Sequence, residues 1–102
     1  MMKKQEILLF LLEKYADWEA AYLSTAVYSM SRDNYEIKTV SLSKEPIHSV
    51  GGLCVVPDYD LESMPEDYAA LILVGGYTWR TGDVAALRPV IERCISQNRL
   101  LG

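Results

Sequence analysis

Two short, uninterrupted apolar segments, residues 7–12 and 70–74, constrain the fold of this chain more than any other feature. Neither segment alternates between apolar and polar residues, as a strand with one face in water does. An unbroken apolar strand is typical of a parallel sheet whose two faces are both covered by helices. We therefore expect both segments to lie at the centre of such a sheet.

Two helical patterns follow these segments. The first begins near Asp17, a predicted N-cap because its carboxylate can accept hydrogen bonds from first-turn amides. Its apolar stripe, at steps of three and four residues, consists of Leu23, Ala26, Val27 and Met30. A second helix is predicted over residues 83–97, and Pro89 requires it to begin shortly before that residue or to bend there. Its predicted inward residues are Val84, Leu87, Val90, Ile91, Cys94 and Ile95.

The pair Gly51 and Gly52 separates two short extended segments and predicts a hairpin with a two-residue turn, because glycine accepts positive φ. In that register His48 and Cys54 point to opposite faces of the hairpin. A His48–Cys54 nucleophile pair is therefore rejected. Cys54 and Cys94 are both interpreted as small apolar core residues.

The predicted order is strand, helix, strand at residues 35–42, hairpin, strand, helix, and the start of a strand at residue 100. Alternating strands and helices predict an α/β fold, a flavodoxin-like three-layer sandwich with a mostly parallel sheet. A length of 102 residues fits a single domain, residues 1–102. Because the last segment stops inside an incipient strand, we expect a fragment, or one piece of a cleaved protein, that ends before further elements.

Composition excludes several classes of function. The net charge is −4 and the basic residues are scattered, so no nucleic-acid partner is expected. The six apolar residues 7–12 are shorter than a signal sequence and far shorter than the roughly 20 residues of a membrane span. A cytoplasmic protein without membrane contact is therefore expected. One histidine and two separated cysteines predict no metal site, and no cofactor is expected.

Ligands of open α/β sheets bind beyond the carboxyl ends of the strands, here residues 13–19 and 75–83. The backbone amides at Gly75 and Gly76 are suited to stabilise an oxyanion, although an ordinary tight turn also fits the pair. Asp17 and Glu19 are separated by one residue, so only one should point into the crevice. With Asp17 as the cap, Glu19 is either a solvated helix-start glutamate or a proton donor to a neighbouring thiolate.

On these residues the whole chain resembles the ThiJ/PfpI superfamily, relatives of the class I glutamine amidotransferases. The resemblance rests on residues 7–19, on the strand and glycine pair at 71–76, and on the helix that leads into residues 99–102. It implies a cysteine hydrolase such as an intracellular protease or amidase, in a superfamily with glyoxalase and chaperone roles as well. It also implies that Glu19 hydrogen-bonds a reactive cysteine located a few residues after Gly102. Gly75 and Gly76 would then supply an oxyanion-hole amide.

Two alternatives remain open at this point. A flavodoxin-like FMN-binding module would use residues 78–82 as a phosphate loop, with Trp79 stacked on the flavin. A non-catalytic scaffold or chaperone-like subunit would use its apolar edges for assembly. The expected partners are a small-molecule or peptide substrate, and either a second copy in a dimer or homo-oligomer or the missing C-terminal half. Trp18, Tyr77 and Trp79 would line a small-molecule pocket or contact such a partner subunit.

Overall fold

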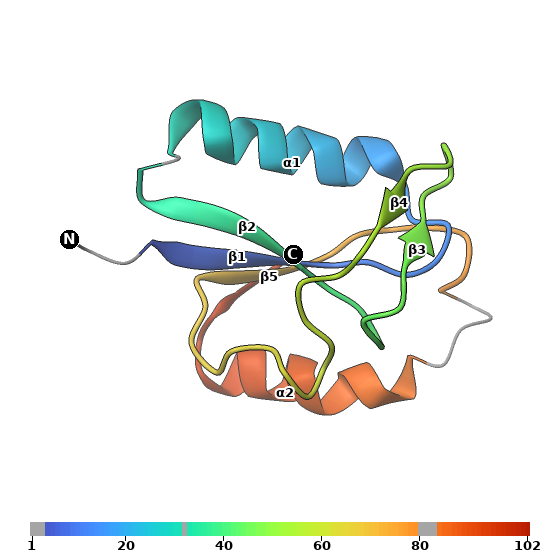
Figure 1. Ribbon diagram of the computed structural model, residues 1–102. Helices are drawn as coiled ribbons and strands as arrows, with labels where there is room; N and C mark the ends of the chain where they lie inside the picture. The colour runs from blue at the N-terminus through green and yellow to red at the C-terminus, as the bar shows by residue number, and fades with distance from the viewer. Residues whose placement is uncertain (1–3, 32, 80–83) are drawn as a thin grey trace.

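The computed structural model describes residues 4–31, 33–79 and 84–102 and contains a four-stranded parallel sheet between two helices (Figure 1). The strand order is β2 (Tyr35–Val40), β1 (Gln5–Phe10), β5 (Ala70–Leu73) and β6 (Leu100–Leu101). Helix α1 (Asp17–Met30) covers one face and α2 (Arg88–Ser96) covers the other. The predicted α/β class and the predicted central position of the two apolar segments in a parallel sheet are therefore confirmed, and the structure adds that these segments pair directly with each other.

Strand β1 explains why residues 7–12 are apolar throughout. Leu8 and Phe10 belong to the buried cluster that includes the α2 residues Val90 and Cys94. Leu9 and Leu11 belong to a second cluster, which packs against α1. Both faces of the strand are thus removed from water, and each buried leucine or phenylalanine contributes roughly 1.5–3 kcal/mol of transfer free energy.

Helix α1 differs from its prediction at the cap and along its apolar stripe. The helix begins at Asp17 itself, the N-cap is Ala16, and no side chain caps this end. The predicted Asp17 cap is therefore wrong, because its carboxylate binds elsewhere. Leu23 packs on the α1-side cluster as predicted, whereas Met30 is 83% exposed. The periodicity located the helix but did not distinguish its buried face from apolar residues left in water.

Helix α2 begins at Arg88, one residue before Pro89, and follows a 3-10 turn at Ala85–Leu87. This start resolves the proline question, because proline in the first helical turn loses no intrahelical hydrogen bond. The predicted start at residue 83 lies outside the described residues. Cys94 is fully buried as predicted, whereas Ile95 is 60% exposed and was wrongly placed in the core.

The hairpin of β3 (Ile47–His48) and β4 (Cys54–Val55) has a different register from the predicted one. His48 pairs directly with Cys54, and the connecting loop has three residues between Ser49 and Leu53, closed by the bond from Ser49 N to Leu53 O. Gly52 takes the positive φ of 88° that such loops require. His48 and Cys54 therefore share a face, and Cys54 is exposed rather than part of the core.

In the described ranges of the chain, no helix combines the length and the apolar character needed to cross a membrane.

Candidate active site

Residues 14–16, which follow β1 after three intervening residues, form the central segment of the candidate site. On one side this segment is bonded to the hairpin. The Lys14 amide donates to the His48 carbonyl at 2.6 Å, and the Val50 amide donates to the Tyr15 carbonyl at 2.9 Å. Lys14 itself has a positive φ of 64°, which turns the chain from the strand toward the helix. The hairpin is therefore fixed at the carboxyl end of β1 by main-chain bonds (Figure 1).

The other side of this segment is bonded to the glycine pair that follows β5. The Ala16 amide donates to the Gly75 carbonyl at 2.8 Å, and the Tyr77 amide donates to the Lys14 carbonyl at 3.2 Å. The two backbones approach so closely that a Cβ at Gly76 would lie 2.7 Å from the Lys14 carbonyl oxygen. No residue with a side chain fits there unless one backbone moves. The predicted glycine turn therefore has a specific steric cause.

Glu19, in the first turn of α1, reaches this glycine pair across the crevice. Its Oε1 accepts a hydrogen bond from the Gly75 amide at 3.1 Å. Its Oε2 would lie 2.8 Å from a Cβ at Gly75, so this glycine also leaves room for the carboxylate. The structure thus brings together all three residues that the sequence singled out, Glu19, Gly75 and Gly76.

The two glycine amides are not equivalent. The Gly75 amide is already used by Glu19. The two main-chain bonds beside Gly76 are made by its neighbours, the Gly75 carbonyl and the Tyr77 amide. Among the described residues, the Gly76 amide itself donates no main-chain hydrogen bond. Gly76 is therefore the amide of the pair that remains able to donate to a ligand in the crevice.

Asp17 points away from Glu19 and binds the hairpin, a role that the sequence did not reveal. Its carboxylate accepts hydrogen bonds from the Ser49 hydroxyl and, at 2.8 Å, from the Gly51 amide. The hydrogen bond from the Ser49 hydroxyl is the largest cause that lowers the pKa of Asp17. Desolvation opposes it, and the hydrogen bond from the Gly51 amide lowers the pKa further. The one-residue spacing had predicted that only one of the two carboxylates would face the crevice, and Glu19 is the one that does.

The aromatic residues of the crevice loop divide into one core residue and one exposed residue. The Trp79 indole donates to the Val74 carbonyl at 2.8 Å, and its ring centroid lies 5.9 Å from that of Phe10. Trp79 is therefore already packed against Phe10, whereas the flavin-binding alternative requires its ring for stacking on the flavin. Residues 80–82 of the suggested phosphate loop lie outside the described residues. Tyr77 is 72% exposed and Trp18 is 54% exposed, so both are accessible to a ligand or partner.

His48 is held by Glu13, not by a cysteine. The Glu13 carboxylate accepts from the His48 amide at 2.8 Å and lies 3.2 Å from the ring Nδ1. Across residues 4–31, 33–79 and 84–102, no group of three or more histidine, cysteine or acidic side chains is arranged to hold a metal ion.

Comparison with known proteins agrees with this geometry. Residues 5–101 match the DJ-1/PfpI family. The chain belongs to this family. It is 38% identical over 79 residues to the uncharacterized protease YdeA of Bacillus subtilis, and 30% identical over 84 residues to the uncharacterized protease YoaZ of the same organism. Each match covers 76% of this chain, but only 37% of YdeA and 40% of YoaZ.

Solved structures of the superfamily have the same fold. A DJ-1 superfamily protein from Agrobacterium tumefaciens superposes with a TM-score of 0.80 at 33% identity, over 95% of this chain and 51% of that one. A ThiJ/PfpI family protein from Bacillus anthracis gives a TM-score of 0.70 at 30% identity, over 95% of this chain and 47% of that one. This DJ-1/PfpI chain therefore spans about half the length of these structures, and the three-layer fold is established for that part.

Proposed function

We propose that this DJ-1/PfpI chain is the N-terminal part of a cysteine hydrolase of the intracellular protease or amidase type. In this proposal the nucleophile is a cysteine located after Gly102, and Glu19 is the residue that tunes its thiol. The observation that carries the proposal is the contact of the Glu19 carboxylate with the Gly75 amide, at the ends of the two central strands. The relatives named as proteases support the class of reaction.

The proposed division of roles follows from the hydrogen bonds. The Gly75 amide holds Oε1 of Glu19, and in this proposal Oε2 is the atom that receives the thiol. The open Gly76 amide supplies one oxyanion donor as the thiolate attacks the substrate carbonyl. A small-molecule amide or a peptide is the proposed substrate. Neither Cys54 nor Cys94 takes the role of nucleophile, because Cys54 lies on the hairpin and Cys94 is buried on the inner face of α2.

The test uses the intact protein with a chromogenic peptide amide as substrate. Glu19→Gln keeps the size of the side chain and should reduce kcat by about a hundredfold, as expected for the loss of a proton-transfer group. Glu92→Gln is the matched control, because Glu92 pairs with Arg88 on the solvent side of α2. Wild-type kcat in Glu19→Gln, or hydrolysis that survives replacement of the cysteine after Gly102, would refute the proposal.

We also propose that the protein acts in the cytoplasm as a dimer. Support comes from Trp18 and Tyr22, which lie one helical turn apart on α1 and are 54% and 80% exposed. Aromatic side chains that protrude from a helix are typical of subunit contacts. Sedimentation equilibrium should give twice the chain mass for the wild type and the single mass for Tyr22→Lys. A monomeric wild type would contradict the dimer without affecting the proposed chemistry.

A further inference from the structure

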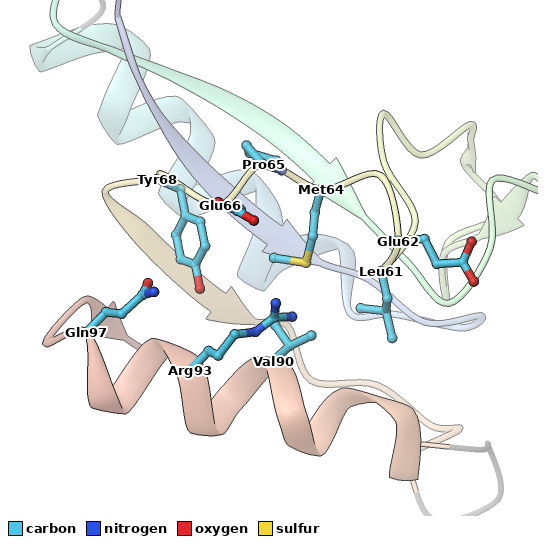
Figure 2. A pocket seen from close by; sticks show the side chains of 9 residues that line it. All are labelled: Leu61, Glu62, Met64, Pro65, Glu66, Tyr68, Val90, Arg93 and Gln97. Carbon is cyan, nitrogen blue, oxygen red and sulfur yellow. The ribbon is translucent and has the colours of Figure 1, made fainter.

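A cavity of about 250 Å³ lies between helix α2 and the loop that precedes β5 (Figure 2). Tyr68, which borders it, comes just before β5, whereas Gly75 comes just after that strand. At about 3.3 Å per residue the cavity is roughly 20 Å from the Glu19 site, at the opposite end of the sheet. It is therefore a separate feature of the molecule.

The inner wall of the cavity is apolar and firmly packed. Val90 and Tyr68 are buried members of the α2-side core, and Leu61 and Met64 pack against that core. Burial, followed by a hydrogen bond involving Cys94, raises the pKa of Tyr68 to about 12, so its hydroxyl stays neutral. A short apolar group that entered the cavity would contact the packed side chains of this core.

The outer wall carries charges of both signs. Arg93 of α2 and Gln97, the residue that caps this helix, both project toward the cavity (Figure 2). The Gln97 Oε1 accepts a hydrogen bond from Arg99 Nε at 2.9 Å, so its amide nitrogen is the group that can meet a ligand. Glu66 approaches from the loop on the other side, whereas the carboxylate of Glu62 points outward at the edge of the cavity (Figure 2). Among the described residues, the arginine ion pairs join Arg88 to Glu92 and Arg99 to Asp67. Neither pair includes Arg93, Glu62 or Glu66.

We propose that this cavity binds a free α-amino acid with a short apolar side chain. The carboxylate of the ligand lies on Arg93 and the amide nitrogen of Gln97, the ammonium group faces Glu66, and the side chain contacts the apolar inner wall. A zwitterion satisfies both signs of charge, whereas a simple anion would meet the Glu66 carboxylate and a simple amine would meet Arg93. The volume is below the 300–1,000 Å³ of pockets for drug-sized ligands and suits a ligand of this size.

The experiment titrates the intact protein with L-leucine by isothermal calorimetry, up to about 10 mM, ten times the dissociation constant of a millimolar site. Two analogues each lack one charge: 4-methylpentanoate has no ammonium group, and 3-methylbutylamine has no carboxylate. We expect leucine to bind, and each analogue to bind at least about tenfold more weakly, because each loses a hydrogen bond between charged groups. Absence of leucine binding, or equal binding of either analogue, overturns the proposal.

Variants then locate the site. Arg93→Gln and Glu66→Gln should each weaken leucine binding by about tenfold, since each removes one of the two charges that the zwitterion needs. Arg88→Gln is the matched control on the same helix and should leave the affinity unchanged, because Arg88 does not line the cavity. Circular dichroism verifies that each variant is folded. Leucine binding that is unaffected by Arg93→Gln overturns the assignment of the carboxylate, and with it the proposal.

Discussion

Replacement of Gly76 by alanine tests whether the close approach of the two backbones holds the site together. The added Cβ would lie 2.7 Å from the Lys14 carbonyl oxygen and 2.9 Å from Tyr15 Cα. Both are backbone atoms in a segment that is hydrogen-bonded on two sides, so neither can move without breaking those bonds. Overpacking of this kind costs about 1–3 kcal/mol, and the lower entropy of the unfolded chain offsets about 0.4–1 kcal/mol.

The net expectation is a loss of about 1–2 kcal/mol in the free energy of unfolding of Gly76→Ala. Equilibrium urea unfolding of the intact protein measures it, and the midpoint should fall by about 0.5–1 M at the usual slopes. The matched variant is Gly75→Ala, for which the three atoms nearest the added Cβ all belong to the carboxylate of Glu19. That flexible side chain can rotate away, so stability should change by less than about 1 kcal/mol.

The comparison of the two variants decides the outcome. If Gly76→Ala is as stable as the wild type, the backbone contact is not rigid and the steric argument is wrong. If Gly75→Ala is destabilised as strongly as Gly76→Ala, the distinction between backbone and side-chain neighbours is wrong.

Three further predictions concern thiol access and pH. Iodoacetamide should alkylate Cys54 well before Cys94, because Cys54 is exposed and Cys94 is buried. Peptide mass spectrometry of the partly modified protein measures the order of alkylation, and equal rates would contradict the hairpin register. The lowered pKa of Asp17 contributes stability that is present above its unfolded value of about 4 and is lost as pH falls below it. Asp17→Asn should therefore be less stable at neutral pH and lose less stability on acidification, in urea unfolding at both pH values. Burial and then the bond to Glu6 raise the pKa of Tyr59 to about 12, so the stability it contributes is full below about pH 10 and falls between about pH 10 and 12. Tyr59→Phe should lack this alkaline loss, and a curve identical to that of the wild type would show that Tyr59 is not responsible.

The sheet could be predicted because its signals are local. The apolar runs at residues 7–12 and 70–74 each report burial of both faces within the segment itself, and β1 and β5 pair as adjacent parallel strands. The positions of Glu19 and Gly75 could be predicted for a related reason. The carboxyl ends of adjacent parallel strands meet at one edge of a sheet, so loops far apart in the sequence must converge there.

The hairpin register could not be predicted in this way, because distant residues determine it. A glycine pair favours a two-residue turn on local grounds. In the structure the Ser49 hydroxyl accepts from the Leu53 amide and donates to Asp17, which lies 32 residues earlier in the chain. These bonds favour the three-residue loop. The same bond explains the wrong cap, because an Asp17 carboxylate that binds the hairpin is not available to the helix amides.

Residues 14–16 have a consequence for how this protein can change its specificity. The bonds from this segment to His48 and Val50 of the hairpin, and to Gly75 and Tyr77, run between main-chain atoms. Side chains at hairpin positions other than Ser49 can therefore be exchanged without loss of these bonds, and the Gly76 amide keeps its place. The hairpin surface can diverge between relatives while the proposed reacting groups stay fixed, so that selection can alter what enters the proposed site independently of its chemistry.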